Sequence, residues 1–253
     1  MGCHYQDYKG CDDVRGVVFD IEGKYAHFRK IYTNSSSLSY TVPPRTTIQG
    51  IIAAILGYER DSYYNYMDSN LYVSVRKNCP TYKMTQTLNY NRAESASDFA
   101  RPKNHTQIPF EVIASKQNVS YRIYVGGDEF SDMDVLVERL KDERYVFPPT
   151  LGTAFFLAEI KFTSEVQFEK CENHDYTPIS SVVKAKAVEE IKLGDISLLK
   201  EKMPYAFGEN RTLKAMESYY IEDNCRKITA KMKNGYSCWK INYGESEEFI
   251  VFM

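Results

Sequence analysis

The sequence lacks any run of about 18 consecutive apolar residues, the length that a membrane-spanning helix needs. Its first 13 residues, MGCHYQDYKGCDD, also lack the apolar core of a secretory signal, so we predict a cytoplasmic protein that enters no membrane. The six cysteines include no Cys-x-x-Cys pair, which argues against a zinc module and a disulfide framework. No P-loop, dinucleotide fingerprint or Gly-x-Ser-x-Gly motif occurs. We therefore expect no metal or other cofactor, and neither nucleotide hydrolysis nor acyl transfer.

Acidic residues are missing from two long stretches, from Gly23 to Tyr58 and from Arg76 to Ala93. The net charge of −2 argues against a general polyanion binder, but an average hides how charge is distributed along the chain. The basic residues of the two stretches are Lys24, Arg29, Lys30, Arg45, Arg76, Lys77, Lys83 and Arg92. Such a segregation of charge is typical either of a nucleic-acid surface or of an ordinary solvated face.

The first half of the chain shows a regular series of strand and helix patterns. Val17, Phe19 and Ile21 alternate with Val18, Asp20 and Glu22, which predicts a strand that runs on through Tyr25 to Phe28. A loop follows, and then a helix that we expect to begin with a capping box at Thr46 and Gln49 and to end at Gly57. Residues 71–76 alternate again and predict a second strand.

About thirty polar and basic residues, 78–108, follow the second strand and predict a projecting hairpin or a flexible arm. A third strand over 121–125, a helix over 130–140 and a fourth strand over 156–162 complete a β-α-β-β-α-β order. This order predicts an α+β, ferredoxin-like domain over residues 14–168, the topology with which RNA recognition motifs present a sheet face to nucleic acid. Residues 169–253 predict a smaller β-rich extension, with a hairpin around Gly235 and a last strand over 248–252.

The loop between the first strand and the first helix combines cations, aromatic rings and short hydroxyl or amide donors. Cations neutralise phosphates, aromatic rings stack on bases, and short donors reach the 2′-hydroxyl. The helix start adds free N–H groups and a positive dipole end that favour one more phosphate. We therefore predict RNA binding by Lys24, His27, Arg29, Lys30, Tyr32, Asn34, Ser35, Arg45, Thr46, Thr47, Arg76, Lys77, Lys83 and Arg92.

The segment GKYAHFRKIYTNSSSLSYTVPPRTTIQGIIAAILG, residues 23–57, resembles the N-terminal signature of the fifth family of CRISPR-associated proteins. That family belongs to the RAMP superfamily and supplies a subunit of the type I surveillance complex Cascade, and the likeness is strongest to type I-B members. FPPTLGTAFFLAEI, residues 147–160, resembles the turn that leads into the family's last ferredoxin-like strand. The likeness extends over about residues 14–165.

The resemblance implies a non-catalytic scaffold in antiviral defence that grips the 5′ handle of the CRISPR RNA. The insertion after the second strand would then act as a thumb that touches the neighbouring backbone subunit of the ribonucleoprotein. The large subunit would lie nearby and inspect target DNA, while base pairing reads the sequence.

Two alternatives remain open. Type I-C members, which this sequence also resembles, cleave precursor CRISPR RNA without metal, and such cleavage needs an acid and a base. His27, Lys103 and His105 are the candidates for those roles, although Asn104 separates Lys103 from His105 where the type I-C members have an adjacent Lys-His pair. The other alternative is a ferredoxin-like interaction module that binds no RNA.

Overall fold

The computed structural model describes residues 13–92, 95–101, 104–171, 175–244 and 246–253 as an α+β fold in which strands predominate. The elements up to residue 171 are β1 (Asp13–Gly23), β2 (Phe28–Arg29), β3 (Ser39–Tyr40), α1 (Arg45–Leu56), α2 (Tyr64–Asn70), β4 (Tyr72–Lys77), β5 (Tyr82–Arg92), α3 (Ala96–Ala100), β6 (Asn104–Ala114), β7 (Val119–Gly126), α4 (Met133–Lys141) and β8 (Glu159–Cys171). The remaining elements are β9 (Thr177–Ile179), β10 (Val183–Lys184), β11 (Val188–Ile191), β12 (Leu198–Phe207), β13 (Leu213–Glu222), β14 (Ile228–Met232), β15 (Cys238–Tyr243) and β16 (Ser246–Ile250), with short 3₁₀ turns at Ala185–Ala187 and Glu209–Arg211.

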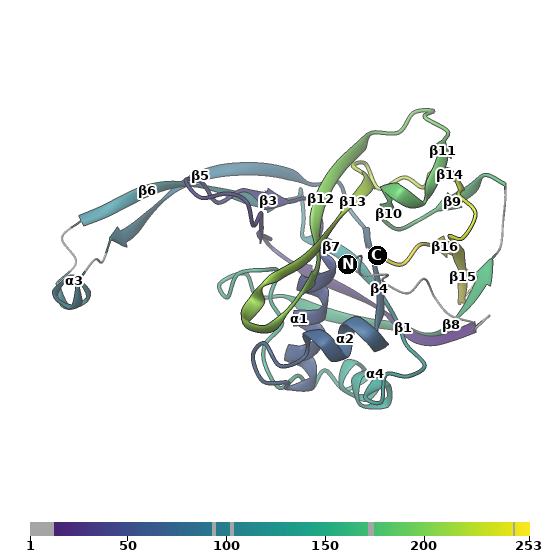
Figure 1. The fold of residues 1–253 in the computed structure, drawn as a ribbon, viewed down its shortest axis with the longest axis horizontal. Coiled ribbons are helices and arrows are strands. Elements are labelled where there is room, and N and C mark those ends of the chain that lie inside the picture. Colours follow the sequence, from purple (N-terminus) through teal and green to yellow (C-terminus); the bar gives the residue numbers. More distant parts are fainter. Residues whose placement is uncertain (1–12, 93–94, 102–103, 172–174, 245) are drawn as a thin grey trace.

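Nine of the described strands form one sheet, in the order β11-β14-β9-β16-β15-β8-β1-β7-β4. Within it, β8, β1, β7 and β4 are the four strands expected from the first half of the sequence, and each pairs antiparallel with its neighbour. Alternation along β1 sends Val17, Phe19 and Ile21 into the core that α1 and α4 also contact. Figure 1 shows these helices together below the sheet.

The opposite side of β1 and β7 is covered as well. Val18 and Tyr124 pack there in a second buried cluster with Trp239 and Phe252 from the C-terminal region. The apolar side chains of these two regions bury each other, because the long sheet curls and brings β15 and β16 back over its own face. This side of β1 and β7 is therefore buried and presents no open face to a ligand.

Helix α1 begins differently from the prediction. Its N-cap is Pro44, with no side-chain cap hydrogen bond, so the expected capping box does not form. The Gln49 amide instead donates to Asp68 Oδ1 at 2.9 Å. The predicted end is confirmed, because Gly57 is the C-cap and takes a φ of 78°, a left-handed conformation that suits glycine.

Strands β5 and β6 form an antiparallel hairpin that runs in register from Tyr82↔Ala114 to Arg92↔Asn104. Figure 1 shows it as an arm that leaves the body of the molecule and carries α3 at its far end. A two-stranded ribbon is only marginally stable by itself, so its base needs support from the body. Bridges from Ala26 to Ile113 and from Ser37 to Phe110 supply that support.

The C-terminal region continues the same sheet, because β8 runs through the expected boundary at residue 168. The turn at Gly235 exists, with a φ of 88°, but its flanking strands β14 and β15 are not neighbours in the sheet. The hairpin predicted there is wrong, since β15 instead pairs with β16 and β8. In the described part of the chain no helix is long and apolar enough to cross a membrane.

Candidate nucleic-acid interface

The acid-free segment after β1 packs directly against the base of the hairpin. Ala26 and Ile113 exchange two backbone hydrogen bonds of 3.0 and 2.8 Å. Ser37 donates its N–H to the Pro109 carbonyl at 2.7 Å and accepts from the Glu111 N–H at 2.9 Å. The first acid-free stretch and β6 therefore form one continuous wall, and β6 pairs in turn with β5, which lies in the second stretch.

His27 is a buried part of this wall, with 2 % of its surface exposed. Its Nδ1 lies 2.7 Å from the Glu111 carbonyl oxygen, which can only accept, so Nδ1 carries the proton. Its Nε2 then accepts from the Ser37 hydroxyl at 3.0 Å, and its ring stacks on Phe110 with centroids 4.0 Å apart. Burial lowers the pKa of His27 below its ordinary value and outweighs the opposing effect of the Glu111 carbonyl. His27 is thus neutral, and its two ring nitrogens are hydrogen-bonded to Glu111 of β6 and to Ser37 of the segment.

This arrangement predicts a loss of stability in mild acid. A histidine whose folded pKa is depressed contributes its full stability above its unfolded pKa of about 6.5 and loses it as the pH falls further. We expect the melting temperature of the wild type to fall more between pH 7.5 and pH 5.5 than that of His27→Gln, which cannot be protonated. Differential scanning fluorimetry measures both profiles, and parallel profiles would contradict the assignment.

A groove of about 380 Å³ lies beside His27, at the start of α1. We call it the α1 groove. Its lining comes from five parts of the chain and includes Arg29 of the segment, Thr46 of α1, Tyr90 of β5, Gly152 of the loop after α4 and Phe207 of β12. A neighbouring cavity of about 400 Å³ shares Thr46, Thr47, Gly152 and Phe207 with it, so the two continue past the N-terminus of α1.

Gly152 allows the loop after α4 to approach this wall. It has a φ of 99°, and a Cβ built there would lie 1.9 Å from the His27 carbonyl oxygen. Any side chain would force the loop away from the segment. The close approach therefore sets the width of the α1 groove on that side.

Several predicted RNA-binding residues are free to meet a ligand near this groove. Lys24, Arg29, Asn34 and Ser35 are exposed, and the Tyr32 side chain is 59 % exposed. Thr46 and Thr47 lie in the first turn of α1, which contains no acidic residue, but Thr46 is buried and the Thr47 N–H already donates to the Pro44 carbonyl at 2.9 Å. The exposed residues form the usable part of the predicted surface.

Other predicted cations meet acids from distant parts of the chain. Arg45 is 2 % exposed and pairs with Asp68, while its Nη1 also donates to the Tyr205 carbonyl at 3.1 Å. Lys77 is 4 % exposed and lies 2.7 Å from Asp223 Oδ1. The remaining pairs are Arg76 with Glu248, Lys30 with Glu201 at 3.1 Å, and Lys83 with Glu111 at 3.6 Å. Arg45, Arg76 and Lys77 are therefore structural ion pairs rather than the free surface cations expected from the sequence.

The candidate residues for catalysis do not come together. His105 is exposed and faces Asn91 in the hairpin, five residues from Phe110 along β6, which is roughly 17 Å of strand. His27 lies at the base of the hairpin instead. Lys103 and the side chain of Arg92 lie outside the described residues. In the described ranges no three His, Cys, Asp or Glu residues are grouped as metal ligands.

Four residues of the interface, two from the hairpin and two from β12, were not recognised as site residues from the sequence. Phe110 and Tyr90 come from the hairpin, and the aromatic residues of that insertion were only a general sign that it could have a function. Glu201 and Phe207 come from β12, in a region without a recognisable motif, and only the folded chain places them beside the segment.

Comparison with known proteins finds a family model that matches part of this chain and solved structures that share its fold. Residues 16–125 match the family model of CRISPR-associated protein (Cas_Cas5). The matched region runs from β1 to β7 and contains both the segment and the hairpin. No curated protein matches this sequence.

Two solved structures share the fold. A chain of a "CRISPR RNA-guided surveillance complex" superposes with a TM-score of 0.51 at 11 % identity, covering 85 % of this chain and 91 % of that one. A CRISPR protein from Archaeoglobus fulgidus superposes with a TM-score of 0.52 at 13 % identity, covering 94 % and 99 %. The similarity thus extends over most of the chain, well beyond the 16–125 match.

Proposed function

We propose that this protein is a non-catalytic, RNA-binding subunit of a CRISPR effector complex. One observation carries the proposal: the region that matches the CRISPR-associated family contains the two acid-poor stretches that fold together around the α1 groove. As a finer proposal, the complex is a type I Cascade, the chain is closest to type I-B members, and the RNA held is the 5′ handle of the guide.

The fold supports this proposal through its strand order. We take residues 14–168 as a ferredoxin-like unit, because β8-β1-β7-β4 is the order of strands 4-1-3-2, with α1 and α2 in the first crossover and α4 in the second. The hairpin is the thumb of this unit, and the C-terminal strands form its extension. Because the outer face near Tyr124 is covered by Trp239 and Phe252, RNA is expected at the α1 groove instead of on the open sheet.

The chemistry of the α1 groove suits one end of a single-stranded RNA. Arg29 supplies an exposed cation for a phosphate, and the N-terminus of α1 supplies a favourable dipole and the Thr47 side chain, which lines the groove. Tyr90, whose side chain is 46 % exposed, supplies a ring against which a base can stack. These are position-fixing contacts, which fits a subunit that leaves sequence reading to base pairing.

The proposed partners follow from the same geometry. The hairpin projects beyond the body and carries Phe99, 78 % exposed, on α3. We propose that it contacts the backbone subunit, with the large subunit beside the handle and target DNA engaged only through the complex. The phenylalanine ring at the end of the arm is a large apolar group that a neighbouring subunit can bury.

The geometry does not favour the nuclease alternative. A general base needs a lone pair aimed at the 2′-hydroxyl, and in His27 the Nε2 lone pair is taken by Ser37 while Nδ1 is protonated. His105 is far along the arm and cannot act with it as a pair. We therefore assign His27 to holding the wall of the groove.

A binding and cleavage experiment tests this function. Purified protein is titrated with its own repeat RNA at several salt concentrations, and the same mixtures, without metal, are run on a denaturing gel. We expect binding without cleavage, and a shallower salt dependence for Arg29→Ala by about 0.7 in the log–log slope, the value for one phosphate contact on a single strand. Lys233→Ala, which removes an exposed lysine from the turn after β14, is the matched control and is expected to keep the slope.

Three outcomes would contradict parts of the proposal. Cleavage that disappears in His27→Ala or His105→Ala would support the nuclease. Absence of RNA binding at low salt would support the interaction module. An unchanged slope in Arg29→Ala would remove the α1 groove as the site.

A further inference from the structure

A second and larger groove, of about 760 Å³, lies on the other side of the same segment. We call it the β12 groove, since its far wall is β12. Successive residues of the segment alternate between the two grooves: Arg29 and Ile31 line the α1 groove, whereas Lys30 and Tyr32 line the β12 groove. The segment is thus a thin partition with a cation and a large side chain facing each way.

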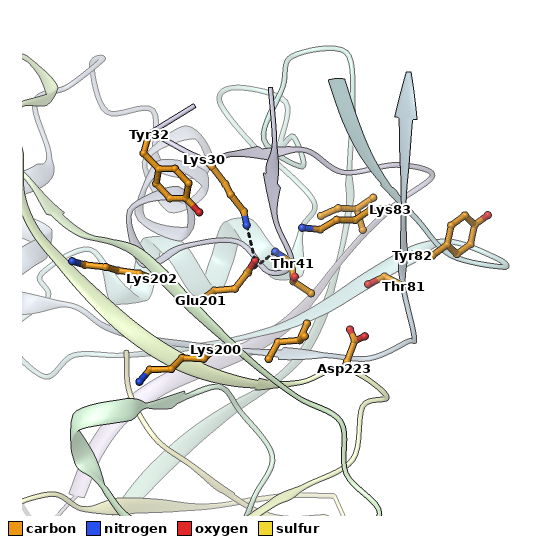
Figure 2. A pocket seen from close by; sticks show the side chains of 12 residues that line it. Lys30, Tyr32, Thr41, Thr81, Tyr82, Lys83, Lys200, Glu201, Lys202 and Asp223 are labelled. Atoms are coloured by element: carbon orange, nitrogen blue, oxygen red, sulfur yellow. Dashed lines mark hydrogen bonds and ion pairs between the residues drawn. The ribbon is translucent and has the colours of Figure 1, made fainter. Parts of the chain in front are cut away.

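The acids that line the β12 groove are already neutralised. Glu201 accepts from the Thr41 N–H at 2.8 Å and pairs with Lys30 at 3.1 Å, as Figure 2 shows near the centre of the groove. Asp223 pairs with the buried Lys77 at 2.7 Å. The carboxylates therefore offer little repulsion to a second negatively charged ligand.

The lysines of β12 remain as the excess charge. Lys200 and Lys202 are exposed, and Figure 2 shows both side chains extending away from Glu201 along one side of the groove. Lys200 lies over the Tyr220 ring at 5.6 Å, a contact that leaves its charge intact. Lys202 forms no ion pair with any residue of the described ranges.

Two exposed tyrosines complete the groove. Tyr32, from the segment, is 59 % exposed, and Tyr82, at the base of β5, is 51 % exposed. Figure 2 shows the two rings on opposite sides of the groove. The hydroxyl-bearing Thr41 and Thr81 line the space between the two walls. Exposed rings beside unneutralised lysines and short donors are the composition of a groove for single-stranded nucleic acid.

We propose that the β12 groove binds single-stranded RNA as a second subsite, where the strand held in the α1 groove continues across the partition. This proposal rests on the proposed function, because it extends the same RNA. Lys200 and Lys202 contact phosphates, and Tyr82 stacks on a base. The C-terminal strands thereby gain a role as the far wall of the RNA path.

The test compares two RNAs of different length. The short RNA carries only the 5′ handle, and the long RNA carries the same handle with several more nucleotides at its 3′ end. We expect Lys202→Glu to weaken binding of the long RNA at least threefold and to change binding of the short RNA less than twofold. Lys233→Glu makes the same charge change at a turn remote from the groove and is expected to affect neither RNA.

A second pair of variants tests stacking independently of charge. Tyr82→Ala is expected to weaken the long RNA about fivefold or more, because it removes a stacking ring, whereas Tyr82→Phe keeps the ring and the affinity. The Tyr82 side chain is exposed, so the melting temperatures of both variants should stay at the wild-type value.

The outcomes separate this proposal from the proposed function. If the wild type binds both RNAs and Lys202→Glu leaves the long RNA unaffected, or weakens both equally, the second subsite is overturned while the function stands. If the wild type binds neither RNA, both are overturned.

Discussion

Arg45→Ala is expected to lower the free energy of unfolding by about 3 to 5 kcal/mol, the usual cost of breaking a buried ion pair by removing one partner. The side chain of Arg45 is enclosed by Asp68, by the carbonyls of Leu71 and Tyr205 and by the Tyr205 ring, whose centroid is 4.8 Å from the guanidinium carbon. Its loss leaves the Asp68 carboxylate, 13 % exposed, without its cation. Urea denaturation measures the change.

Arg29→Ala is the matched control for this prediction. It removes an arginine from the same acid-free segment, but one that is exposed and whose side chain, among the described residues, hydrogen-bonds only to the Thr33 carbonyl at 3.5 Å. We expect a change within about 0.5 kcal/mol. If Arg45→Ala cost no more than Arg29→Ala, Arg45 would return to the list of candidate RNA contacts.

Removing the outer hairpin is expected to abolish entry of the protein into its complex while leaving the fold intact. The deletion takes out residues 88–108 and joins Thr87 to Pro109, which face each other across the ladder, through an Asn-Gly turn. The base of the hairpin keeps Lys83, Phe110 and Ile113, which contact the body. Co-purification with the other subunits measures assembly, and thermal melting measures folding.

The hairpin prediction has its own control and its own contrary result. Phe99→Ser alters the end of the arm without shortening it, and is expected to weaken assembly without abolishing it. If the deletion variant loses its cooperative melting transition, the arm is part of the core fold. If it assembles normally, the arm is not the contact with the backbone subunit.

Local patterns in the sequence predicted most of the first half of the fold. The alternation along β1 and β4 and the apolar stripe of α1 each report which face of an element is buried, and burial follows from nearby residues. The Gly57 cap was predictable because few other residues take a positive φ at a helix end. The expected capping box was wrong, because the N-cap of α1 is Pro44 rather than Thr46. The Gln49 side chain donates to Asp68 instead.

The C-terminal strands show where local patterns fail. Gly235 marks a turn correctly, but a turn does not determine which strand becomes the neighbour of β14. That pairing depends on β9 and β11, which are separated from β14 by dozens of residues, and on the burial of Trp239 and Phe252 against Tyr124. Strand order is a property of the whole sheet.

The sequence by itself determined where basic residues outnumber acidic ones along the chain. It also determined where the strands and helices of the first half lie and where the hairpin is inserted between them. Only the tertiary structure decided which cations are free, because a stretch without acids along the chain is not without acids in space. Asp68, Glu201 and Asp223 neutralise Arg45, Lys30 and Lys77 from 23, 171 and 146 residues away along the chain, while Arg29 has no such partner among the described residues. Coulomb attraction acts over a few ångströms whatever the separation in sequence, so the usable RNA surface depends on folding.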